Sequence, residues 1–180
     1  MSRLYSVNLH DEYPDLGMLT GYKSLGGRAL LQKNYGQKND CTLTSLAFLY
    51  GVEKYPQIEQ IAMRYGYDGK KNGTSPFVVR KIMLACNKQF SVSGTCCVRY
   101  GKGISFDYET VKSVIDKGHY LLLNLWKDGR DYYKNHAVTV IGYEAYERGR
   151  FLIVFDNWNS TYSYIDYGKL SLISSVNWME

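Results

Sequence analysis

The chain has 180 residues, and its 45% hydrophobic content is enough for one continuous core, which predicts a single domain over 1–180. The net charge of +5 is spread along the chain without a basic cluster, which argues against a nucleic-acid partner. No apolar run is long enough for a membrane span, and the N-terminus lacks the apolar stretch of a signal peptide. We therefore expect a cytoplasmic protein without a membrane partner, or a secreted one if a leader has been removed.

The four cysteines do not have the spacing of a disulfide-stapled secreted domain, which favours a reducing compartment. Three scattered histidines and no Cys-x-x-Cys pair give no metal-ligand spacing, so we expect no metal. The glycines at 101 and 103 lack the sequence context of a phosphate-binding loop, and their default interpretation is a turn. No motif announces a cofactor.

The first part of the chain, 1–40, carries many glycines and is predicted to be an irregular arm with at most one short strand near 28–32. Apolar residues then recur at helical spacing over 42–50, and Gly51 is placed to end that helix. This pattern puts Cys41 at the N-terminus of a helix.

Further helices are predicted at about 57–66 and 75–87, so the first half of the chain is mainly helical. The second half of the chain has mainly strand patterns, with one more helix between them. The expected elements are strands at 95–100, 120–126, 136–144, 150–156 and 162–166, a helix at 107–117, and a short C-terminal element. We predict an α+β fold with an N-terminal helical half packed on a C-terminal antiparallel sheet.

The strands at 136–144 and 150–156 are joined by a connection short enough for a hairpin. In a hairpin the end of one strand meets the start of the other. His136 opens the first strand and Asp156 ends the second, so the two side chains are expected to lie together. The two other histidines have no such partner motif.

Cys41 is the best candidate for a nucleophile. A helix N-terminus stabilises a thiolate through its partial positive charge and its N–H groups. The default interpretation of a cysteine is a small buried apolar residue, and Cys86, Cys96 and Cys97 fit it. Cys41 does not, because polar residues at 37–40 precede it.

His136 is the predicted general base, since a strand gives its imidazole a rigid mount. The Asp156 carboxylate would accept the ring N–H and stabilise the imidazolium. Taken alone, an aspartate followed by an asparagine at a strand end is more typical of a turn.

The order of Cys41, His136 and Asp156 resembles that of papain-like cysteine peptidases. The segment FLIVFDNWN is similar to their strand-end motif, with Asp156 in place of the orienting asparagine and Trp158 in place of the tryptophan that shields it from solvent. The helical first half and KSVIDKGHYLLLNLW resemble the compact bacterial branch, the bacteriocin-processing (double-glycine) peptidases, which commonly use aspartate as the third residue. The resemblance extends over about 30–170 in element order.

The resemblance implies a hydrolase that cleaves amide bonds of a peptide or protein substrate through a Cys-His-Asp triad and an acyl-enzyme. It also implies that Gln37, with the N–H of Cys41, stabilises the oxyanion. Two departures stand out: Gln37 lies closer to Cys41 than in the family, and Thr42 and Leu43 replace its usual glycine or tryptophan.

Several alternatives to a peptidase remain at the level of sequence. A transglutaminase or deamidase, or an acyltransferase, would use the same triad with another acceptor, and a catalytically idle domain could keep the papain-like shape. The sequence leaves the oligomeric state open.

Overall fold

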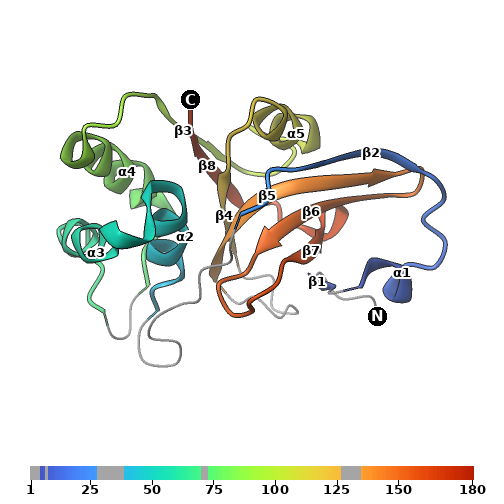
Figure 1. Cartoon of the computed structure of the whole chain (residues 1–180), viewed down its shortest axis with the longest axis horizontal. Helices are drawn as coiled ribbons and strands as arrows, with labels where there is room; N and C mark the ends of the chain where they lie inside the picture. Colours follow the sequence, from blue (N-terminus) through green and yellow to red (C-terminus); the bar gives the residue numbers. More distant parts are fainter. Residues whose placement is uncertain (1–4, 7, 28–38, 70–72, 127–134) are drawn as a thin grey trace.

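The computed structural model describes residues 5–6, 8–27, 39–69, 73–126 and 135–180. Three helices gather beside an antiparallel sheet, which confirms the predicted α+β fold (Figure 1). These helices are α2 (Cys41–Tyr50), α3 (Tyr55–Met63) and α4 (Pro76–Phe90), with a short 3₁₀ turn η1 (Val52–Lys54) before α3. Proline stands in the first turn of both α3 and α4, where its missing N–H costs no helical hydrogen bond.

Among the described residues the sheet has eight strands, and every pairing between these strands is antiparallel. Its order is β1-β7-β6-β5-β4-β8-β3, and β2 pairs with the second half of β5. The strands are β1 (Tyr5–Ser6), β2 (Leu19–Ser24), β3 (Cys96–Tyr100), β4 (Leu121–Leu125), β5 (His136–Tyr146), β6 (Gly149–Phe155), β7 (Ser163–Asp166) and β8 (Ser175–Met179). The predicted C-terminal element is thus β8, an interior strand between β4 and β3.

The hairpin predicted from the sequence is confirmed. Tyr146 of β5 pairs with Gly149 of β6 across a two-residue turn, and Thr139 pairs with Phe155 at the other end. The start of β5 and the end of β6 therefore lie at the same edge of the sheet.

The interpretation of 1–40 as an irregular arm is wrong in its described part, which contains β1, α1 (Leu9–Glu12) and β2. β2 lacks an apolar alternation, and Leu19 and Tyr22 on it are exposed. Main-chain pairing with β5, as between Tyr22 and Glu144, holds it in the sheet, and residue type does not record such pairing. The short strand expected near 28–32 lies outside the described residues.

The sheet has a separate apolar core on each face. On one face α2, α3 and α4 pack against Cys96, Leu122 and Ala137. On the other face α5 (Tyr108–Asp116) packs against alternate residues of β4, β5 and β6. Cys97 contacts this second core, so Cys96 and Cys97 point to opposite faces of β3, as predicted.

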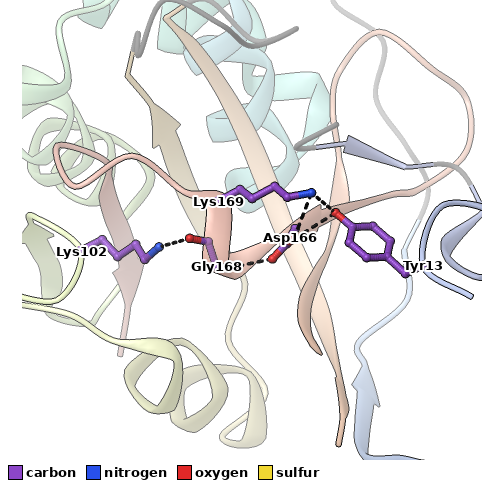
Figure 2. A network of polar contacts seen from close by, with 5 residues as sticks. All are labelled: Tyr13, Lys102, Asp166, Gly168 and Lys169. Atoms are coloured by element: carbon purple, nitrogen blue, oxygen red, sulfur yellow. Dashed lines mark hydrogen bonds and ion pairs between the residues drawn. The ribbon is translucent and has the colours of Figure 1, made fainter. Parts of the chain in front are cut away.

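A polar network fastens the N-terminal segment to the sheet (Figure 2). Tyr13 donates its hydroxyl hydrogen to the Asp166 carboxylate at 3.0 Å, and the Lys169 ammonium donates to the same hydroxyl at 2.6 Å. Lys169 also pairs with Asp166 at 3.4 Å, and the N–H of Gly168 donates to Asp166 at 2.8 Å. The network joins the chain after α1 to the end of β7.

Removing the Tyr13 hydroxyl tests how much this network stabilises the fold. We expect Tyr13→Phe to lower the free energy of unfolding by about 1 kcal/mol, because a part-buried carboxylate and an ammonium lose a shared partner. Urea denaturation at pH 7 measures the change. Tyr22→Phe, at an exposed side chain, is the control. Equal midpoints for both variants would contradict the expectation.

Candidate active site

Cys41 is the first residue of α2, as predicted. The helix is anchored by buried apolar residues such as Leu43 and Leu46. The carbonyl of Asp40 accepts the N–H of Thr44 at 2.9 Å and its hydroxyl hydrogen at 3.1 Å, which closes the first turn. The thiol of Cys41 is therefore held at the rim of a rigid helix and is only partly exposed.

His136 is the first residue of β5 and pairs with Leu125 of β4. Its side chain is buried, with 5% of its surface exposed. The ring Nε2 lies 2.6 Å from the carbonyl oxygen of Asp156. A carbonyl only accepts hydrogen bonds, so Nε2 carries the hydrogen and Nδ1 is the lone-pair nitrogen of the neutral ring.

The sequence predicted that the Asp156 carboxylate accepts the ring N–H, and a hydrogen bond from Nε2 of His136 runs to the main-chain carbonyl of the same residue. The carboxylate accepts the N–H groups of Trp158 and Asn159, each at 2.9 Å, and the side-chain amide of Asn159 at 2.6 Å. Asp156 thus folds the loop after β6, and that loop presents the carbonyl to the ring. The negative charge of the Asp156 carboxylate also favours the protonated form of the His136 ring.

Trp158 stacks on the imidazole of His136, with ring centroids 4.0 Å apart and planes 28° apart. The indole covers one face of the ring, next to the hydrogen bond with Asp156. The resemblance implied that Trp158 shields Asp156 from solvent, and in the structure its indole stacks on the ring to which the Asp156 carbonyl is hydrogen-bonded.

The thiol of Cys41 meets the histidine strand at Ala137, the residue after His136. The N–H groups of Ala137 and Thr42 and the hydroxyl of Thr42 contact the sulfur and lower the thiol pKa. Burial raises the pKa more strongly, and the nearby Asp40 carboxylate adds to that effect, so the net change is upward.

Burial lowers the pKa of His136 from 6.5 to about 4, against the opposing effects of the Asp156 carbonyl and carboxylate. With the pKa of Cys41 raised, the thiol and the imidazole are both neutral at pH 7. A neutral imidazole is the form that accepts a proton.

Asp40 is a second buried carboxylate beside the nucleophile. It is fully buried, and one of its oxygens accepts the hydroxyl hydrogen of Tyr55, from α3, at 2.5 Å. Its negative charge opposes ionisation of Cys41. In the sequence Asp40 is one of several polar residues before Cys41, and its burial could not be predicted because it depends on the helices packed over it.

Asn157 joins the loop after β6 to α2 and β5, a role that was not predicted from the sequence. Its amide nitrogen lies 3.2 Å from the carbonyl oxygen of Cys41, 2.9 Å from the hydroxyl of Ser45 and 3.0 Å from the carbonyl oxygen of Ala137. An Asp-Asn pair is typical of a turn, and the positive φ of 65° at Asn157 fits that turn. The sequence carried no sign of its reach to α2.

Gln37, the predicted oxyanion donor, lies outside the described residues. The N–H of Cys41 is at the start of α2, where main-chain N–H groups have no acceptor within the helix. The described residues contain no group of three histidine, cysteine or acidic side chains that could bind a metal ion. None of the helices in that part of the chain is long and apolar enough to cross a bilayer.

The lowered pKa of His136 predicts an acid-sensitive fold. Between pH 6.5 and about 4 the unfolded chain takes up a proton at His136 that the folded chain excludes, so the free energy of unfolding falls as the pH falls. We expect this loss to reach on the order of 3 kcal/mol at pH 4. Urea denaturation of the wild type and His136→Gln from pH 7 to 4 measures it: the wild type should lose more stability, and parallel pH curves would contradict the assignment.

The sequence matches no protein-family model and no curated protein sequence at a significant level. A solved structure from work on the mite allergens Blo t 1 and Der p 1 is similar to this chain, with a TM-score of 0.57 and 15% sequence identity. The match covers 91% of this chain and 71% of that one. That neighbour has the papain-like fold of a cysteine protease, and at this identity the likeness concerns the fold. The chain therefore has a papain-like α+β fold.

Proposed function

We propose that this chain is a cysteine peptidase-like hydrolase that cleaves amide bonds through Cys41, His136 and Asp156. One observation carries the proposal. The thiol of Cys41, at the start of α2, contacts the N–H of Ala137, the residue after His136. The imidazole of His136 is itself oriented by its hydrogen bond to the Asp156 carbonyl and by the stacked indole of Trp158. A nucleophile, a base and an orienting group in this arrangement are the parts that covalent acyl transfer needs.

In the proposed reaction, Nδ1 of His136 takes the thiol proton while Sγ of Cys41 bonds to the substrate carbonyl carbon, and the carbonyl oxygen becomes an oxyanion. The N–H of Cys41 and the side chain of Gln37 are the proposed donors to it. As the oxyanion collapses, the C–N bond breaks and the amine leaves with the proton from the imidazolium. Water then gives a proton to His136, attacks the thioester, and releases the acid and the thiol.

The Asp156 carboxylate contributes to this reaction in two ways. It stabilises the imidazolium by charge, because it raises the pKa of His136 against the effect of burial. It also holds the loop that presents the carbonyl to Nε2. An aspartate in this role supports the finer proposal that the chain is closest to the compact bacterial peptidases of the bacteriocin-processing type.

An aromatic cluster supports a peptide substrate with an apolar side chain. The rings of Phe77 and Tyr100 lie 5.4 Å apart, and those of Phe77 and Trp126 lie 5.9 Å apart. Trp126 directly follows Leu125, the residue paired with His136, so the cluster begins beside the candidate base. Phe77 is 64% exposed and offers apolar surface to a ligand.

A specific observation keeps the catalytically idle domain as a second candidate. The resting thiol is neutral because burial raises its pKa, and a neutral thiol is a weak nucleophile. This resting state is compatible with either candidate, because an enzyme can move the thiol proton to its base as the sulfur attacks the substrate.

Labelling of the cysteines separates the two candidates. We expect a broad cysteine-protease inhibitor to label Cys41 before the other three cysteines, and Cys41→Ser to abolish peptide cleavage. Cys97→Ser, at the other half-buried cysteine, is the control and should keep full activity. Peptide mapping by mass spectrometry reads the labelled site. An inhibitor that reacts with Cys97 while Cys41 stays unmodified would rule out the proposed nucleophile.

The acceptor of the acyl group is tested with the same protein. Incubation with a glutamine-containing protein and a primary amine should release cleaved peptide if water is the acceptor. Incorporation of the amine would instead show a transferase, and ammonia release without cleavage would show a deamidase.

Phe77 tests the substrate side of the proposal. We expect Phe77→Ala to raise KM about 5- to 10-fold for peptides with a large apolar side chain near the scissile bond, with kcat little changed. The residue is exposed, so the fold should tolerate the change. Ile104→Ala, at another exposed apolar residue, is the matched control. Steady-state kinetics on peptides that differ in that side chain measure the effect, and an equal KM for both variants would argue against the cluster as a binding surface.

A further inference from the structure

The amide of Asn157 lies at the junction of the nucleophile helix and the histidine strand. It donates to the carbonyl of Cys41, the proposed nucleophile, and to the carbonyl of Ala137, the residue after His136. A third contact reaches the hydroxyl of Ser45, one turn further along α2. Only 2% of Asn157 is exposed, so water does not compete for these contacts.

The backbone explains how one short loop serves both the ring and the helix. Asp156 and Trp158 hold the imidazole of His136 by the carbonyl and the indole. Asn157, between them, has a φ of 65°, in the left-handed region that asparagine tolerates better than most residues. Its amide is thereby directed to α2 instead of to the ring, as its contacts with Cys41 and Ser45 show.

We infer that Asn157 is a positioning residue that fixes the start of α2 against the start of β5, so that the thiol and the imidazole keep a reactive separation. The inference rests on the proposed function of Cys41 and His136. Two amide hydrogens serve three oxygen atoms here, and without them two main-chain carbonyls lose a buried donor. The helix end would then shift relative to the base, while the substrate surface stays unchanged.

Two variants remove the amide in different ways. Asn157→Asp keeps the size of the side chain but places an oxygen against the three acceptors. Asn157→Gly keeps the left-handed backbone without strain and removes the side chain. Two variants are needed because either one alone could act through an altered fold.

The test is the pH–rate profile of iodoacetamide alkylation at Cys41, mapped by mass spectrometry, together with kcat and KM on a peptide substrate. We expect both variants to lose about 10- to 100-fold in Cys41 reactivity at pH 7 and a similar factor in kcat, with KM within about twofold. Their profile should approach that of His136→Gln.

Asn87→Asp is the matched control. Asn87 is another buried asparagine, 8% exposed, that accepts the hydroxyl hydrogen of Tyr50 at 2.5 Å and donates to the carbonyl of Gly94 at 3.4 Å. The same substitution there should lower the denaturation midpoint and leave the Cys41 profile unchanged.

The outcomes separate this inference from the proposed function. Wild-type profiles in both Asn157 variants, with a changed profile in His136→Gln, would overturn the inference alone. Equal losses of Cys41 reactivity in Asn87→Asp and Asn157→Asp would also overturn it, because loss of any buried asparagine amide would then be enough to lower that reactivity. An unchanged profile in His136→Gln would overturn the proposed function and the inference with it.

Discussion

The hydrogen bond from Nε2 of His136 to the carbonyl of Asp156 is the contact on which the candidate site depends. It fixes the tautomer, so Nδ1 is the nitrogen that can take a proton. It also ties the end of β6 to the start of β5 beyond the last strand pair, and the next two residues complete the site. Trp158 covers the ring, and Asn157 joins the same loop to Cys41. The segment 156–158 therefore connects the end of β6, the start of β5 and the start of α2.

Burial has opposite consequences for the two reacting groups, and together they define the resting state. It raises the pKa of the Cys41 thiol and lowers that of the His136 imidazole, so both groups are neutral near pH 7. The Asp40 carboxylate reinforces the first effect, and the Asp156 carboxylate opposes the second. Proton transfer in the proposed reaction then accompanies attack on the carbonyl, and no resting ion pair is required.

Most elements after residue 40, and the meeting of His136 with Asp156, could be predicted from the sequence because their signals are local. Helical spacing placed Cys41 at a helix start, and a short connection between two apolar strands placed His136 beside Asp156. The rest depends on backbone geometry, which residue type records poorly. The hydrogen bond from His136 to the Asp156 carbonyl depends on the turn after β6, and the contacts of Asn157 with α2 depend on its positive φ. β2 was missed because main-chain pairing, and not an apolar face, holds it.

The protonation state of the His136 ring tests the account most directly. Long-range ¹H–¹⁵N NMR of the wild type, with His136→Gln to assign the signals, reports which nitrogen carries hydrogen at each pH. The account predicts a neutral ring with hydrogen on Nε2 at pH 7, and protonation only as the pH approaches about 4. A ring protonated on both nitrogens at pH 7, or a neutral ring with hydrogen on Nδ1, would contradict it.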